Sequence, residues 1–262
     1  MSVIILQYNR TKRIIQILLL LILIGFIYFF IFARFFSNTA NENNWFNDHF
    51  RTSLAKHEFW RSVFNLHRDG DGQFIYLTKS KLAIVIYTTE NNQLSAEVRN
   101  SLEQEIKSIL PDILDIRFYD GQQLNLTKSS YMRQEIREFI NDLPKKRLAD
   151  DTALLNVYVL NRSEEYPSNV GLTNAENGVV VFWDMIKDLT SENSSTFEAY
   201  LTSTILHEFG HQLGLSHLDD SSCIMSAIVE SPGTIEAGDY WPVKNYCRQE
   251  KALIEIKQKS KN

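Results

Sequence analysis

The sequence predicts an α+β domain, in which helices cover a twisted mixed β-sheet, preceded by a single N-terminal transmembrane helix. Two observations predict this arrangement. From residue 81 onward, short apolar segments rich in β-branched residues alternate with amphipathic segments of helical period. Residues 14–33 form one long apolar segment without a charge. Because strands that alternate with helices form βαβ units, at least part of the sheet should be parallel.

The elements of the domain follow from the periodicity, taken in chain order. A buried strand is predicted at 82–89, a helix at 95–111 that begins at Ser95 and ends near Pro111, and a second strand at 113–121. The same pattern predicts a helix at 128–146, a strand at 153–161, and two short strands, 170–173 and 178–183, joined by a turn. After Asp184 we expect a polar loop, and from about Thr196 a further helix.

The apolar segment near the N-terminus has the length of a membrane span. At about 1.5 Å per residue, a helix of about 20 residues crosses a hydrocarbon core of about 30 Å. Arg10, Lys12 and Arg13 precede it, whereas only Arg34 follows it closely. By the positive-inside rule, residues 1–13 should be cytoplasmic, residues 14–36 a signal anchor, and the remainder extracytoplasmic. A cleaved signal peptide is the alternative, although its apolar region would run only about 7–15 residues.

Residues 37–80 show no regular period and are expected to be a juxtamembrane linker or an inhibitory pro-segment, with a short amphipathic helix at 46–67. The stretch contains no cysteine, so a pro-segment of this chain cannot inhibit through a thiolate. The carboxylate of an aspartate such as Asp69 could take that role instead. The "RDGDG" at 68–72 lacks the bidentate glutamate of a calcium loop and is interpreted as a tight turn.

The charge is unevenly distributed. Four of the 27 basic residues and none of the 32 acidic residues lie in residues 1–36, so the remainder of the chain carries a net charge of about −9. This balance argues against nucleic acid or anionic lipid as a partner. The two cysteines, Cys223 and Cys247, lie in the part expected outside the cell, where a disulfide can persist.

Residues 207–217 read "HEFGHQLGLSH" and have the spacing of a metal site. His207 and His211 are four residues apart, so on a helix both project from one face and can bind one ion. Glu208 can reach a metal-bound water as general base without being a ligand. Gly214 can adopt a positive φ and reverse the chain, which brings His217 back as a third ligand. Three neutral imidazoles leave one position open for water, as in catalytic zinc sites.

Residues 57–61, "HEFWR", repeat the first three residues of this motif and so serve as a comparison for it. Arg61 stands there in place of the second histidine. His57 and Glu58 are therefore interpreted as solvated or capping residues.

The full pattern H-E-x-x-H-x-x-G-x-x-H, followed by a methionine turn, resembles the metzincin clan of zinc peptidases. Met225 in "SCIMSA" matches the Met-turn, and Cys223 two residues before it makes the sequence most similar to the archaemetzincins. The resemblance covers residues 82–255 and is strongest in 204–226. It implies one catalytic Zn²⁺, an active-site helix, and a small C-terminal subdomain with the Met-turn and a last helix at 247–259.

The resemblance also implies how a substrate binds. An edge strand of the sheet, for which we expect 178–183, would pair antiparallel with an extended peptide. The segment 226–242 would line the pocket beyond the scissile bond, with Tyr240 and Trp241 as candidate lining residues.

Archaemetzincins carry four cysteines for a second, structural zinc, and this sequence departs from that pattern. Leu218 and Lys244 stand where two of the four would be. A second zinc is therefore not expected, and we expect instead a disulfide between Cys223 and Cys247, with two free thiols as the alternative.

These observations predict a membrane-anchored zinc endopeptidase that acts on a peptide or protein substrate. His207, His211 and His217 would hold the zinc, and Glu208 would be the general base. Two alternatives remain open: a non-proteolytic zinc-containing binding module at the cell surface, and a zinc hydrolase of a non-protein amide.

Overall fold

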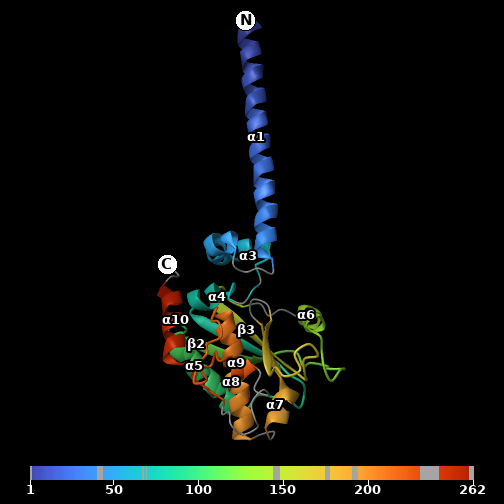
Figure 1. Ribbon diagram of the computed structural model, residues 1–262, viewed down its shortest axis with the longest axis vertical. Coiled ribbons are helices and arrows are strands. Elements are labelled where there is room, and N and C mark those ends of the chain that lie inside the picture. Colours follow the sequence, from blue (N-terminus) through green and yellow to red (C-terminus); the bar gives the residue numbers. More distant parts are fainter. Residues whose placement is uncertain are drawn as a thin grey trace. The chain divides into compact units, whose positions relative to one another are not determined.

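The computed structural model describes residues 2–39, 44–66, 68, 70–143, 148–174, 178–190, 194–230 and 242–259. The chain divides into two compact units, Met1–Leu66 and His67–Asn262. Figure 1 shows the elements, labelled where there is room, and each unit is described by itself.

The first unit consists of one long helix and three short helical pieces. Helix α1 spans Ser2–Ser37, and its part from Lys12 to Ser37 is, among the described residues, the one helix long and apolar enough to cross a membrane. It is therefore a candidate membrane span or signal anchor. The short pieces are η1 (Asn47–Arg51), α2 (Thr52–Ala55) and α3 (Glu58–Phe64). The single amphipathic helix expected at 46–67 is wrong, because His57 adopts an extended conformation that separates α2 from α3.

The second unit is an α+β domain built on a five-stranded sheet. Its elements are α4 (Gln73–Thr78), β1 (Lys81–Tyr87), α5 (Ala96–Ile109), β2 (Asp115–Asp120), α6 (Arg133–Asp142), β3 (Thr152–Leu160), β4 (Gly171–Asn174), β5 (Gly178–Phe182), α7 (Trp183–Leu189), α8 (Ser195–Gln212), α9 (Ala227–Glu230) and α10 (Arg248–Lys259). The strand order is β2-β1-β3-β5-β4, and only β4 is antiparallel to its neighbour. The predicted mixed sheet is confirmed.

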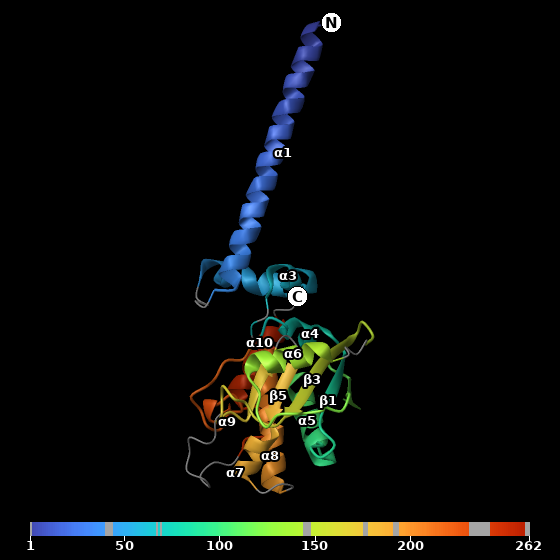
Figure 2. The same ribbon diagram turned by 90° about the vertical axis from the view of Figure 1, so that its right-hand side faces the viewer.

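The sheet separates two apolar clusters because alternate side chains of a strand point to opposite faces. On β5, Val179 and Val181 join the larger cluster with α5 and α8, whereas Val180 and Phe182 join the smaller cluster with Ile136 of α6. Figure 2 shows α6 in front of β3 and β5. The active-site helix α8 therefore lies in the larger cluster, buried against one face of the sheet.

Three helices of this unit lie where none was expected: α4, α7 and the four-residue α9. Helix α7 replaces the polar loop after Asp184, and its Trp183 and Ile186 are buried. Helix α4 lies within the stretch expected to be a linker or pro-segment, yet Tyr76 is only 1% exposed. The Tyr76 hydroxyl donates to the carbonyl of Leu154 on β3 at 3.2 Å, and its ring lies edge-on to Phe209 of α8 at 5.1 Å. The compact domain thus includes residues that precede 81.

Candidate active site

Helix α8 holds the first part of the motif rigidly inside the domain. The Ser194 hydroxyl begins the helix by accepting the N–H of Phe197 at 3.1 Å. Apart from Glu198, every residue from Phe197 to Gly210 is buried. A helix that is buried on all sides belongs to the core of its domain, so the first two histidines are carried by a fixed element.

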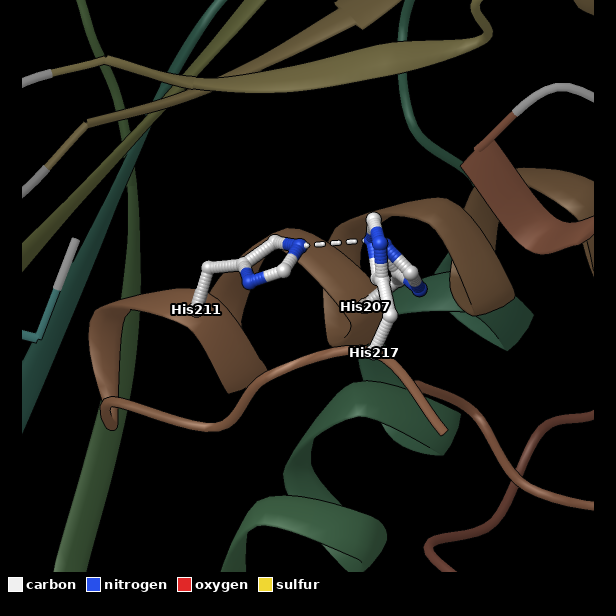
Figure 3. Close-up of side chains that lie close together, drawn as sticks. All are labelled: His207, His211 and His217. Carbon is white, nitrogen blue, oxygen red and sulfur yellow. Dashed lines mark hydrogen bonds between the residues drawn. The ribbon is translucent and has the colours of Figure 1, made fainter. Parts of the chain in front are cut away.

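The three histidines of the motif converge on one point. His207 and His211 lie on α8 and His217 on the loop that follows, and Figure 3 shows their rings meeting. The Nε2 atom of His217 lies 3.2 Å from Nε2 of both His207 and His211. Nitrogens bound to a tetrahedral zinc at about 2.0–2.1 Å are roughly 3.3–3.4 Å apart. The three imidazoles therefore fit a single zinc ion and could hold it.

Backbone carbonyls orient the two helical histidines. Nδ1 of His207 lies 2.7 Å from the carbonyl oxygen of Ile224, and Nδ1 of His211 lies 3.0 Å from that of Leu215. Because a carbonyl oxygen only accepts, each Nδ1 must carry the proton, which leaves the lone pair on Nε2. This second hydrogen bond fixes the tautomer that a metal ligand needs.

Gly214 ends α8 and returns the chain toward the histidines. Its φ is +73°, the left-handed region in which a side chain is strained. The N–H of Gly214 bonds to the carbonyl of His211 at 2.9 Å, and the N–H of Leu215 to that of Gly210 at 2.9 Å. A Cβ added to Gly70, the other glycine with a positive φ among the described residues, would lie 2.6 Å from Cα of Gly214. The two backbones therefore touch at this turn.

The carboxylate of Glu208 is buried and held by the neighbouring strand. Glu208 is 2% exposed, and Thr173 of β4 donates its hydroxyl proton toward Oε2 at 2.8 Å, with the Glu208 carbonyl oxygen 3.2 Å away. A Cβ at Gly171, two residues earlier, would lie 3.2 Å from Cγ of Glu208 and 2.5 Å from Cγ2 of Thr204. Strand β4 and helix α8 are thus in direct contact beside the histidines.

Met225 packs beneath the helix that carries the histidines. It is fully buried, and a Cβ added to Gly210 would overlap its sulfur. The N–H of Leu218 bonds to the carbonyl of Met225 at 2.8 Å, which joins the end of the motif to the methionine turn. A larger residue at position 210, between the two histidines of α8, would therefore require the Met225 side chain to move.

A disulfide joins the methionine turn to the last helix. Cys223 and Cys247 are bonded, and they lie 24 positions apart in sequence. Both sulfurs are committed to this bond, so they provide no thiolate for a second zinc. The side chain of Glu250 lies beside them and is fully buried, accepting the N–H of Met225 on one oxygen and that of Cys247 on the other. Burial raises the pKa of Glu250, and the backbone N–H donors oppose that rise.

Tyr246 connects the same region to α8 and α5. Its hydroxyl donates to the carbonyl of Leu206, and its N–H bonds to Oε1 of Glu105 at 2.8 Å. Burial, together with the charges of Glu250 and Glu105, raises the pKa of Tyr246 well above its ordinary value. Tyr246 and Glu250 were not identified from the sequence, since both act through contacts between distant segments.

Strand β4 forms the edge of the sheet, and the expectation that 178–183 would form it is wrong. Residues 178–182 are β5, which lies between β3 and β4 and pairs on both sides. Strand β5 is entirely apolar because it is covered on both faces, which distinguishes an interior strand from an edge strand. The strand beside Glu208 is the edge.

The remaining residues considered from the sequence lie in the first unit or outside the described part of the chain. His57 and Glu58 of "HEFWR" lie at the start of α3 and are both exposed, and no second histidine joins them among the described residues of that unit. Tyr240 and Trp241, like Asp69, fall outside the residues that the structure describes.

Comparison with known proteins places this site in a family. The sequence model of the matrixin peptidases matches residues 35–239. Among solved structures, the chain is similar to an archaemetzincin from Methanopyrus kandleri (14% identity, 69% of this chain and 97% of that chain, TM-score 0.48). It is also similar to a zinc-dependent peptidase from Methanocorpusculum labreanum (15% identity, 65% of this chain and 99% of that chain, TM-score 0.46). No curated protein matches the chain.

Proposed function

The chain belongs to the matrixin family of zinc metallopeptidases, and from this premise we propose that it is a membrane-anchored endopeptidase with Glu208 as general base. In this proposal the zinc ligands are His207, His211 and His217. The observation that carries the assignment is the convergence of three Nε2 atoms whose rings are oriented by carbonyls on the other nitrogen.

The bound metal and Glu208 have different roles in the proposed reaction. When bound, zinc polarises the scissile carbonyl and lowers the pKa of water. Glu208 takes the proton of the attacking water and passes it to the leaving amine. Glu208 adjoins the first ligand in sequence, and its carboxylate is buried beside β4, where Thr173 holds it. In the proposed role it acts on the attacking water without being a ligand itself.

Strand β4 is proposed as the substrate-binding edge. One side of β4 pairs with β5, and no other strand among the described residues pairs with it. An extended peptide added to this edge would form main-chain hydrogen bonds that recognise backbone rather than sequence. Its scissile bond would then lie beside Glu208, which β4 contacts through Thr173.

The N-terminal helix is proposed as a signal anchor that places the catalytic domain outside the cytoplasm. The support is the apolar length of Lys12–Ser37 and the excess of basic residues before it. Residues 37–66 would then connect the anchor to the domain.

The experiment that tests the function uses the full chain in detergent micelles, with bound metal measured by elemental analysis beside peptide-library hydrolysis. We expect about one zinc per chain in the wild type, much less in His211→Ala, and wild-type zinc without turnover in Glu208→Ala. Hydrolysis by the zinc-loaded Glu208→Ala protein would contradict the proposed base. A zinc-loaded wild type that cleaves no peptide would favour a binding module, or a hydrolase of non-peptide amides if it cleaves those.

A further inference from the structure

Residues 44–66 form a compact helical cap on the C-terminal end of α1, where a single short amphipathic helix was expected within a linker or pro-segment. The cap comprises η1, α2, α3 and the residues that flank them. Figures 1 and 2 both show α3 lying across the axis of α1 at that end. Ala33 at the end of α1 is fully buried in a cluster with Phe46, Phe64 and Leu66 of the cap.

Hydrogen bonds to backbone carbonyls hold the cap in place. The guanidinium of Arg51 donates to the carbonyl of Ser37, the last residue of α1, at 2.7 Å. In the other direction, Arg34 and Ser37 of α1 donate to the carbonyls of Val63 and Phe64 at 3.2 and 3.1 Å. The carbonyl groups at the end of a helix need such partners, especially in a setting with little water.

The length of α1 sets the depth at which the cap would lie in a membrane. Residues 14–36 span roughly 34 Å as a helix, slightly more than a hydrocarbon core of about 30 Å. If α1 crosses the bilayer, its end at Ser37 therefore reaches the interface between hydrocarbon and water. A helix that lies across α1 at this point lies parallel to the membrane surface.

The cap exposes aromatic rings at this level. Trp45 is 58% exposed and Phe59 65% exposed, although both stand among other aromatic side chains of the cap. Tryptophan is the residue that favours the membrane interface, because its ring is apolar and its N–H can bond to water or lipid headgroups. Short helices with exposed aromatic rings and a polar remainder are typical of interfacial segments.

We propose that the cap is an interfacial platform that rests in the headgroup layer of a lipid bilayer, with Trp45 and Phe59 as its lipid contacts. The proposal rests on the membrane anchoring of the proposed function. Exposed charges of both signs, Asp48, Lys56 and Glu58, give the cap no strong electrostatic preference, so a zwitterionic bilayer suffices. The platform fixes the direction in which the chain leaves the membrane at Leu66.

The test places the full chain in nanodiscs of phosphatidylcholine that carries bromine, a quencher of tryptophan fluorescence, either near the headgroup or near the chain end. We expect the shallow bromine to quench wild-type emission more than the deep bromine. Because Trp60 is a second, partly exposed tryptophan of the cap, the comparison is made in a Trp60→Phe background. In that background the fluorescence quenched by shallow bromine should disappear in Trp45→Phe and return when Phe59→Trp is added. Trp183→Phe, which removes a buried ring of the other unit, should leave the quenched component unchanged.

Retention of the protein in the membrane after alkaline carbonate washing is measured on the same samples. Retention without Trp45-dependent quenching would overturn the platform while leaving the anchor intact, because the ring would then face water or protein. Loss of the protein from the membrane would overturn the anchor and the platform together. Neither result bears on zinc binding or turnover, which separates this test from that of the catalytic site.

Discussion

The hydroxyl of Thr173, on the edge strand β4, lies 2.8 Å from the carboxylate of Glu208, on the active-site helix α8. One hydrogen bond therefore joins the strand proposed to bind the substrate to the proposed general base. The hydrogen bond to Oε2 fixes the orientation of the Glu208 carboxylate. Thr173 is in this view a positioning residue rather than a catalytic one.

Replacing Thr173 with valine removes the hydroxyl and keeps the shape of the side chain. We expect kcat to fall by roughly 10- to 100-fold with KM little changed, since a hydrogen bond to a charged group contributes about 1.5–3 kcal/mol. Steady-state kinetics on a peptide substrate, with zinc content measured alongside, checks this.

Two further variants show whether that effect is specific. Thr173→Ser keeps the hydroxyl and should restore most of kcat. Thr204→Val makes the same change one helical turn before Glu208, at a buried hydroxyl that is one of the few without a hydrogen-bond partner among the described residues. It should leave kcat unchanged. Equal losses in Thr173→Val and Thr204→Val would mean that packing, not orientation, is responsible.

Gly210→Ala should destabilise the domain although alanine is the better helix former. The added methyl group would overlap the sulfur of Met225, and overpacking of this kind costs about 1–3 kcal/mol. Urea unfolding of Gly210→Ala, Met225→Ala and the double variant measures the coupling. In the Met225→Ala background, Gly210→Ala should lower the free energy of unfolding much less, because the methionine side chain that the new methyl group would overlap has been removed. Additive costs would show that Gly210 and Met225 do not meet.

Loss of the disulfide should lower stability without loss of zinc. Cys223 and Cys247 close a loop of about 24 residues, which corresponds to about 3 kcal/mol in the loop-entropy account. The double variant Cys223→Ala, Cys247→Ala should therefore unfold roughly 6–12 °C lower in a thermal scan of a domain of this size. An unchanged Tm would indicate that the two cysteines are free thiols. A loss of zinc would mean that the disulfide is also needed to keep the three histidines in position.

The orientation of the chain can be tested with its own glycosylation sequons. Asn125 is exposed in the segment between β2 and α6, whereas Asn161 uses its side chain to donate to the carbonyl of Lys128 at 2.8 Å. A further sequon, at Asn193, is removed by Asn193→Gln so that it adds no glycan of its own. In that background, synthesis in eukaryotic microsomes should add a glycan at Asn125, visible as a mobility shift that Asn125→Gln removes and Asn161→Gln does not. A full-length, membrane-retained product without any glycan would mean that the domain faces the cytoplasm.

The parts of the structure predicted well are those that local pattern determines. The strands at β1, β2 and β3 are long enough for their composition to identify them, and Ser95 caps α5 by accepting the N–H of Val98 at 3.2 Å. The spacing of the histidines on α8 is likewise local, because helical geometry alone places His207 and His211 on one face.

The features that sequence reasoning missed depend on long-range contacts or are too short to show a period. Helices α4 and α7 have six and seven residues, about two turns, which is too few for a helical pattern to stand out. The edge strand was misassigned because strand order is a property of the whole sheet. Thr173 and Glu250 are polar residues in unremarkable sequence, and their roles appear only when β4 and α10 lie against the active-site region.

The contact between the backbones of Gly70 and Gly214 limits where the chain can be cut. Helix α4 begins three residues after Gly70 and supplies Tyr76 to the core against α8, so these residues are structural parts of the domain. If the chain is anchored as proposed, proteolysis that releases an active enzyme from the membrane must therefore occur on the N-terminal side of Gly70. Likewise, if the enzyme matures from a zymogen, its removable inhibitory segment must end before this glycine.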